Sequence, residues 1–165
     1  MPVSPLTVRP FAQRDVADVL RLMRNLAVFE GYIDKFRVTE MDLIEHGLGD
    51  NPRFGVLVAD LGGRVVGIAV HYVIPWTYDL KPTLVLKELF VDETARSLGA
   101  GAALIEALKR HAAAIGTPRI EWSVLASNEA AKRFYGRQGA ILDAIWEPWT
   151  LLIQTEDDGK EASGV

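Results

Sequence analysis

Hydrophobic and polar positions recur along this chain with two periods, which predict alternating strands and helices. Leu6–Arg9 has the pattern of a short first strand. From Asp15 onward, apolar residues fall at the spacing of an amphipathic helix: Val16, Val19, Leu20, Met23 and Leu26. Thr39–Asp42 is typical of a capped start, which predicts a short helix ending near Gly47. Two β-rich runs, 54–60 and 64–74, flank Leu61-Gly62-Gly63 and predict a hairpin.

The second half of the chain continues the alternation. We expect a strand over 83–91, a helix over 99–115 and a strand over 119–125. Ser127 or Asn128 can cap a further helix, which Gly139 ends. Two closing strands are expected over 141–145 and 150–153. The resulting order, β-α-α-β-β-β-α-β-α-β-β, predicts a mixed α/β fold in one domain.

Composition narrows the class of protein. The chain has 165 residues, of which 49% are hydrophobic and 24% charged, as in an ordinary globular domain. We expect a domain over residues 1–154 and a disordered polar tail over 155–165. The net charge of −4, with no basic stripe, argues against a nucleic-acid partner. The longest apolar run, 67–76, is too short to span a bilayer, so no membrane association is expected.

Cysteine and histidine usage limits the chemistry. The chain has no cysteine, which excludes disulfides, thiolate metal sites and an acyl-cysteine intermediate. His46, His71 and His111 lack the spacing of metal ligands, so no metal site is expected. No charged leader followed by an apolar segment is visible at the start. These features together predict a cytoplasmic protein.

The junction between the expected strand 83–91 and the expected helix 99–115 has the features of an anion site. Gly99 and Gly101 allow a ligand to approach the backbone closely, and the first helical amides have no internal partners. Together with Arg96 and the positive end of the helix dipole, they favour a diphosphate. Taken alone, the two glycines are more often residues of helix start or packing. Leu104 excludes a dinucleotide-binding fingerprint, and no Gly-Lys-Ser/Thr follows for a P-loop.

A second motif, over 128–139, follows the strand–helix junction along the chain. Arg96, Gly99 and Gly101 are followed by Asn128, Ala131, Phe134, Tyr135 and Gly139, and both motifs in this order resemble the GCN5-related N-acetyltransferase superfamily. The resemblance implies a single-domain acetyl-CoA N-acyltransferase fold, with a mixed central sheet flanked by about four helices. It implies acetyl-CoA as cofactor and CoA as product. The cofactor-binding residues it implies are Leu89, Phe90, Val91, Arg96, Ser97, Leu98, Gly99, Ala100, Gly101, Ala102, Asn128 and Tyr135.

A closer resemblance, to the diamine (spermidine/spermine) acetyltransferase subgroup, covers most of the chain. It rests on 26–30, 39–49 and 146–149. It implies a homodimer and a small-molecule amine substrate, held by Phe29, Glu30, Lys87, Glu88, Glu147 and Trp149. The subgroup usually has an acid at the position of Lys87, so the local charge is reversed here.

The residues also predict roles in acetyl transfer. An alkyl amine has a pKa near 10.4 and is mostly protonated at neutral pH, so the reaction needs a base, for which Glu88 is the candidate. Tyr135 is the candidate acid for the departing thiolate. Alternatives stay open: Tyr135 as a core residue, and Glu88 as an ion-pair partner of Lys87 or Arg96.

We therefore expect direct attack by a primary amine (of a polyamine, a diamine or a lysine-like molecule) on acetyl-CoA in a ternary complex. One alternative is a protein or peptide N-acetyltransferase. The other is a non-catalytic acyl-CoA sensor on the same fold.

Overall fold

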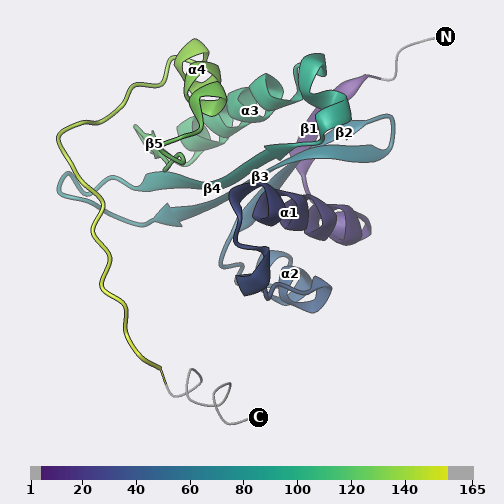
Figure 1. The fold of residues 1–165 in the computed structure, drawn as a ribbon, viewed down its shortest axis with the longest axis horizontal. Helices are drawn as coiled ribbons and strands as arrows, with labels where there is room; N and C mark the ends of the chain where they lie inside the picture. The colour runs from purple at the N-terminus through teal and green to yellow at the C-terminus, as the bar shows by residue number, and fades with distance from the viewer. Residues whose placement is uncertain (1–4, 156–165) are drawn as a thin grey trace.

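One central sheet separates two layers of helices (Figure 1). The structure, a computed structural model, describes residues 5–155. The strands lie in sequence order in the sheet: β1 (Leu6–Pro10), β2 (Gly55–Leu61), β3 (Arg64–Ile74), β4 (Thr83–Val91) and β5 (Ile120–Glu121). The pairs β1–β2, β2–β3 and β3–β4 are antiparallel, whereas β4 and β5 are parallel.

Within residues 5–155, four α-helices cover the sheet, and they lie on both of its faces (Figure 1). On one side lie α1 (Val16–Glu30) and α2 (Glu40–Gly47), and on the other α3 (Ala100–Ala114) and α4 (Glu129–Arg137). Three short 3-10 turns complete the set: η1 (Gln13–Asp15), η2 (Ile33–Lys35) and η3 (Glu93–Leu98). A hydrophobic core lies on each face, one built around Leu104 and Leu108, the other around Leu22 and Leu43.

A β-bulge in β4 sets which side chains face each layer. Val70 of β3 pairs with Glu88 and the next residue, His71, pairs with Leu86, so Lys87 is the extra residue. A bulge reverses the alternation of side chains beyond it. Leu86 and Leu89 therefore both join the core beneath α3, and Glu88 points to the α1 side.

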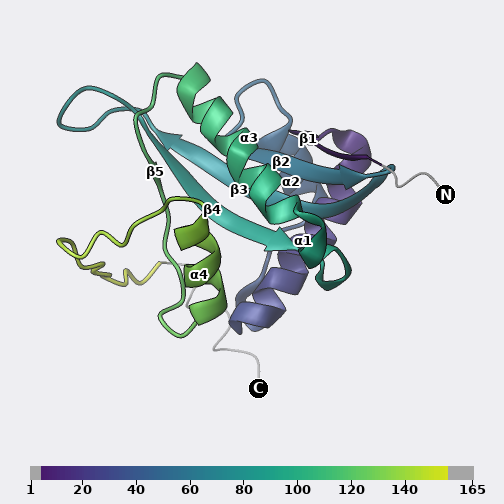
Figure 2. The ribbon, with the colours of Figure 1, turned by 90° about the horizontal axis from the view of Figure 1, so that it is seen from above.

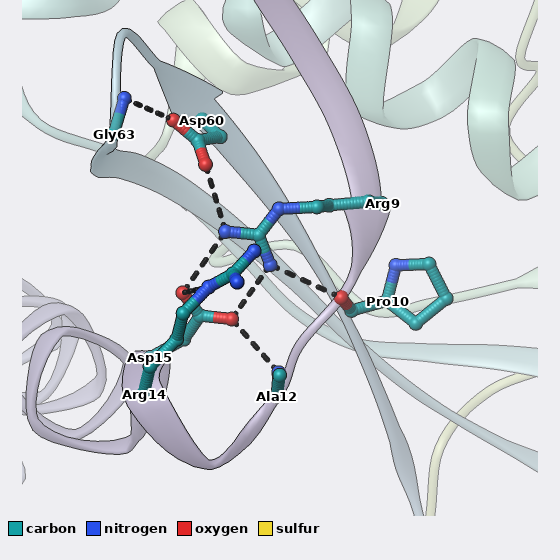
Figure 3. Close-up of polar contacts among 7 residues, drawn as sticks. All are labelled: Arg9, Pro10, Ala12, Arg14, Asp15, Asp60 and Gly63. Carbon is teal, nitrogen blue, oxygen red and sulfur yellow. Dashed lines mark hydrogen bonds and ion pairs between the residues drawn. The ribbon is translucent and has the colours of Figure 1, made fainter.

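An ion-pair network fixes the start of α1 against the sheet (Figure 3). The two terminal nitrogens of Arg9 on β1 bond both carboxylate oxygens of Asp15, at 2.6 and 3.0 Å, and one also bonds Asp60 at 2.7 Å. Asp15 is buried, and its carboxylate also accepts the N–H of Ala12. The Arg9 guanidinium lowers the pKa of both carboxyl groups. The network thereby joins β1, β2 and α1.

The predicted fold class, the hairpin and the four helices are confirmed, but the C-terminal strands are wrong. The strand expected over 119–125 is paired only at Ile120–Glu121, and the closing strands at 141–145 and 150–153 are not formed. A strand needs a neighbouring edge, and every residue from 141 to 155 lies exposed, away from any other strand. Of the tail expected over 155–165, residues 156–165 lie outside the described residues. No helix among residues 5–155 is long and apolar enough to cross a membrane.

Candidate active site

The candidate site lies where β4 and β5 diverge. The two strands pair only at Leu84–Ile120 and Val85–Glu121. Beyond Val85, no strand within residues 5–155 pairs with this edge of β4, which leaves the backbone of 86–91 open. Figure 2 shows α3 lying across the sheet and α4 beside β5, so both helices border the divergence. An extended ligand can therefore pair with Leu89–Val91 as an additional strand would.

The N-terminus of α3 lies at the end of the same strand. Gly99 takes the left-handed conformation, with φ of 80°, between η3 and α3, and no side chain caps the helix. The first amides of α3, at Ala100, Gly101 and Ala102, thus have no partner within the helix. The Nε of Arg96 donates to the Val91 carbonyl at 3.3 Å, and its guanidinium lies 5.9 Å from the centre of the Phe90 ring.

This arrangement suits a phosphate-bearing ligand. Unpaired amides and the positive end of a 15-residue helix attract an anion, and Arg96 adds a full positive charge beside them. Ser97 and Leu98 are exposed in η3, so a ligand reaches the loop from solvent. The residues present therefore fit the diphosphate of a CoA-type cofactor.

Glu88 is a half-buried carboxyl without a partner. Its Oε2 is buried and makes no hydrogen bond within the described residues. Burial raises the pKa of Glu88, the Lys87 charge opposes this rise, and the Glu30 charge adds to it. A carboxylate with a raised pKa is a stronger base than an exposed one, so the position suits proton acceptance. Among the described residues, neither Lys87 nor Arg96 donates a hydrogen bond to the buried Oε2 of Glu88.

The charge of Glu30 acts on Glu88 and on two tyrosines, Tyr32 and Tyr135. Burial, with the charges of Glu88 and Glu30, raises the pKa of Tyr32 to about 12. Burial and the Glu30 charge likewise raise the pKa of Tyr135 to about 12. Glu30 thus influences the pKa of Glu88, Tyr32 and Tyr135, which belong to β4, the turn after α1 and α4. An acidic, partly buried cluster of this kind suits an ammonium group.

Tyr32 is a site residue that the sequence motifs did not identify. Gly31 ends α1 with φ of 80°, which allows the Tyr32 N–H to reach back to the Ala27 carbonyl at 2.9 Å. In this position Tyr32 is half-buried, and the Glu88 charge contributes to its raised pKa. The sequence signal for this turn was Gly31, the glycine after the helix. Such a glycine indicates that the chain changes direction, but it does not indicate which residues the next side chain contacts.

Tyr135 and Asn128 belong to α4. The Tyr135 ring lies 5.0 Å from that of Trp122 and 5.3 Å from that of Phe134, and it packs on the α3-side core. Asn128 is the N-cap of α4, because its Oδ1 accepts the Ala131 N–H at 3.0 Å. This bond gives Asn128 a structural role, while its side-chain NH2 group is not part of the cap. Gly101 lies against Phe134, which explains a small residue there: a Cβ would approach the ring to 3.1 Å.

Not every predicted substrate residue lies in this cluster. Lys87 is exposed at the bulge, and Phe29 is 59% exposed on α1. Glu147 and Trp149 lie on the exposed stretch after α4, where Trp149 is 90% exposed. Their predicted role in amine binding stays a prediction.

Two of the histidines, distant in sequence, are in contact. The rings of His71 on β3 and His111 on α3 lie 4.8 Å apart. Within residues 5–155 no group of three or more histidine or acidic side chains could hold a metal ion.

The fold is of the mixed α/β type, and the open edge of β4 beside the N-terminus of α3 suits an acyl-CoA cofactor. Residues 21–140 match the Acetyltransferase (GNAT) family, and the chain belongs to this family. It is an acetyl-CoA-dependent N-acetyltransferase: acetyl-CoA is the donor and CoA the product.

Individual relatives agree with the family. The human spermidine/spermine N(1)-acetyltransferase-like protein 1 is 31% identical over 84% of this chain, which spans 21% of that protein's length. The thialysine N-epsilon-acetyltransferase of Sus scrofa is 27% identical over 84% of this chain and 85% of its own. A crystal structure of an aminoglycoside acetyltransferase from an uncultured soil metagenomic sample superposes with a TM-score of 0.72 at 25% identity, covering 89% of this chain and 97% of that one.

Proposed function

We propose that this enzyme acetylates a primary amine of a small molecule: a polyamine, a diamine or a lysine-like amino acid. The observation that carries the proposal is Glu88, whose buried Oε2 has no hydrogen-bond partner within the described residues and whose pKa burial and the Glu30 charge both raise. An ammonium group supplies the missing partner. The names of the spermidine/spermine-like and thialysine relatives support this class of substrate.

The chain's own groups account for the steps of transfer. The bound acetyl-CoA supplies an activated acetyl thioester. Glu88 takes a proton from the ammonium group, directly or through water, and releases a neutral nucleophile. A backbone N–H in the open stretch Leu89–Val91 stabilises the developing charge on the carbonyl oxygen, a contribution of about 3 kcal/mol to the barrier. The nucleophilic nitrogen forms its bond to the carbonyl carbon, the carbon–sulfur bond breaks, and the nitrogen loses its second proton to solvent, from which Tyr135 regains the proton that it gives to sulfur.

Tyr135 supplies a proton to the departing thiolate. A pKa of about 12 keeps the phenol protonated at every physiological pH, so the proton that it donates is always present. It also makes complete transfer to a thiol of reference pKa about 8.5 uphill by roughly 3.5 pKa units. The phenol therefore acts as a hydrogen-bond donor whose proton moves only as negative charge accumulates on sulfur. The lack of cysteine excludes an acyl-cysteine intermediate, and the reaction proceeds by direct attack in a ternary complex in this proposal.

The remaining assignments belong to the same proposal. Arg96 and residues 97–102 hold the diphosphate, and Asn128 binds the cofactor through its NH2 group. Phe29, Glu30, Lys87, Glu147 and Trp149 contact the amine substrate. We further propose a cytoplasmic homodimer.

Release of CoA, measured with a thiol reagent, tests the proposal directly. The chain has no cysteine, so the product is the only thiol present. We expect turnover with one class among polyamines, diamines and lysine analogues. Tyr135→Phe should lower kcat by about 100-fold, because general-acid assistance is lost, and leave acetyl-CoA binding unchanged.

The same assay also distinguishes the proposed function from its alternatives. Turnover with peptides but with no free amine would favour a protein or peptide acetyltransferase. Acetyl-CoA binding without any turnover would favour a sensor. Ping-pong kinetics with a stable acetylated enzyme would exclude the ternary complex.

A further inference from the structure

Lys87 is a primary amine built into the strand that borders the candidate active site. Strand β3 pairs with Leu86 and with Glu88 and skips Lys87, which is the extra residue of the β4 bulge. Lys87 is exposed, whereas Glu88 is half-buried. Because the enzyme transfers acetyl groups to amines, a lysine at this position has the chemistry of an acceptor.

The bulge turns Lys87 and Glu88 toward the same face of the sheet. Leu86 and Leu89 both belong to the core beneath α3. Side chains alternate along a strand, so the residue after Leu86 and the residue before Leu89 both point away from that core. These two residues are Lys87 and Glu88, and the face that they share is the one on which α1 lies. An ammonium group and a carboxyl group are therefore neighbours in sequence on one face of the sheet.

Glu88 is a suitable base for this ammonium group. Its buried Oε2 has no hydrogen-bond partner within the described residues. Burial raises the pKa of Glu88, and the Lys87 charge opposes this rise, so the two groups interact. No ion pair within residues 5–155 includes the Lys87 ammonium group, which leaves the side chain free to turn. A proton can therefore pass from Lys87 to Glu88, directly or through water.

The stem of Lys87 is long enough to bring its nitrogen to the reacting carbonyl group. In the proposed reaction, the acetyl group lies at the open backbone of Leu89–Val91. Two residues of a strand span about 6.6 Å. The flexible four-carbon stem of a lysine places its nitrogen roughly 6 Å from its Cα. Lys87 therefore reaches the position at which the substrate amine attacks.

We propose that the enzyme acetylates its own Lys87, from acetyl-CoA bound to the same chain, when no amine substrate occupies the site. This inference rests on the proposed function, because it uses the same acetyl donor, the same base and the same acid. It adds a modification site to the protein.

The reaction at Lys87 balances as it does for an external amine. Glu88 takes one proton from the Lys87 ammonium group, and the neutral nitrogen attacks the thioester carbon. The carbon–sulfur bond breaks as the amide forms, and Tyr135 gives a proton to the departing thiolate. The nitrogen and Glu88 each release one proton to solvent, and Tyr135 regains one from it. The products are Nε-acetyl-Lys87, CoA and one proton.

Self-acetylation changes the charge at the site. The amide of acetyl-lysine is neutral, so the cation at the bulge is lost. A polycationic amine is then repelled less. The modification therefore adapts the enzyme to a polyamine after a period in which acetyl-CoA is plentiful and the amine is scarce.

Mass spectrometry of the full-length protein tests self-acetylation. The protein is incubated with isotope-labelled acetyl-CoA without any amine and is then digested with a protease that does not cut at lysine. The label should appear on Lys87 at least about tenfold faster than on Lys81, an exposed lysine on the connection before β4. The first-order rate constant should not depend on the concentration of the protein.

Two variants show whether the chemistry of the site is responsible. Tyr135→Phe should slow the labelling of Lys87 about 100-fold and leave the labelling of Lys81 unchanged. Lys87→Arg keeps the positive charge in a group that stays protonated and is not acetylated. Incubation with acetyl-CoA should therefore raise kcat/KM for a polyamine in the wild type and not in Lys87→Arg.

Three results overturn the proposal. The first is equal labelling of Lys87 and Lys81. The second is labelling of Lys87 that Tyr135→Phe does not slow, which shows uncatalysed acetylation. The third is a rate constant that rises in proportion to protein concentration, which shows transfer between chains.

The CoA-release assay on the same preparation separates this inference from the proposed function. Release with a small amine but no label on Lys87 contradicts self-acetylation alone. Label on Lys87 without turnover of any small amine supports self-acetylation and contradicts the proposed substrate. Neither release nor label contradicts both.

Discussion

At the scale of single residues, the site depends on carboxyl and phenol groups whose pKa values burial has moved. Glu88 illustrates how one backbone irregularity creates such a group: without the bulge at Lys87, its side chain would face the opposite core. The sequence suggested Glu88 by its position before Leu89–Val91. It could not show the proximity of Glu30 and Tyr32, because that depends on how α1 packs against β4.

Removing the carboxylate of Glu88 should slow the reaction and change its pH dependence. Glu88→Gln keeps the shape but cannot accept a proton, so kcat/KM at neutral pH should fall by roughly 100- to 1,000-fold. In the wild type, kcat/KM should fall as pH drops through the pKa of Glu88, which lies above the ordinary value. This acidic limb should be absent in the variant. The measurement is kcat/KM for the best amine between pH 5 and 9.

Glu30→Gln serves as the matched comparison. The Glu30 charge raises the pKa of Glu88, so its removal should move the acidic limb to lower pH without abolishing it. An unchanged limb in Glu88→Gln would contradict the assignment of Glu88 as base.

Lys87 tests whether charge at the bulge selects the amine. Its ammonium group is exposed beside the acidic cluster, so it should repel a polycation. Lys87→Glu should raise kcat/KM for a polyamine about fivefold at low salt, a modest gain because exposed charges interact weakly. The gain should shrink at high salt, and Lys87→Gln should be intermediate. Equal kcat/KM in all three proteins would mean that another feature sets specificity.

At the scale of elements, the local hydrophobic pattern predicted the helices and the hairpin correctly. It failed for strands whose pairing partner would lie far away in the sequence. Helix α1 follows from the spacing of Val16, Val19 and Met23, which its own residues determine. The strands expected over 141–145 and 150–153 have suitable residues but no edge in the same chain. Alternation in the sequence indicates that one face of a strand can be buried, but it does not identify the surface that buries it.

The loop before α3 allows a test of its backbone with two glycines. Gly99 has φ of 80°, which a Cβ disfavours, so Gly99→Ala should lower the free energy of unfolding by about 1 kcal/mol. Gly136 lies within α4 with nothing within 4 Å of a built Cβ, so Gly136→Ala should raise it by about 1 kcal/mol. Urea unfolding of both variants measures the two signs. Destabilisation of equal size in both would show that the left-handed backbone at Gly99 does not explain the effect.

At the scale of the whole molecule, buried ionisable groups make stability depend on pH in two separate windows. Asp15 and Asp60, paired with Arg9, have lowered pKa values in the folded protein. They therefore stabilise the fold at any pH above their pKa in the unfolded chain, which is about 4. This stabilisation is lost as the pH falls through their pKa values in the folded protein. His71 acts in a different range. Burial, together with the His111 charge, lowers its pKa from 6.5 to about 4.

The His71 window should dominate the loss of stability in mild acid. Between pH 6.5 and 4 the unfolded chain binds a proton at this histidine that the folded chain does not, so the free energy of unfolding falls as pH falls. A difference of about 2.5 pKa units corresponds to roughly 3 kcal/mol at most. His71→Gln, which is neutral at every pH, should remove most of this decline, as urea unfolding at a series of pH values will show. Asp60→Asn should keep the decline above pH 4 and flatten the curve only below it, because it changes the Arg9 network and not the histidine pair. If His71→Gln declines as steeply as the wild type between pH 6.5 and 4, groups other than the buried histidine control acid stability, and its contact with His111 has no energetic consequence in that range.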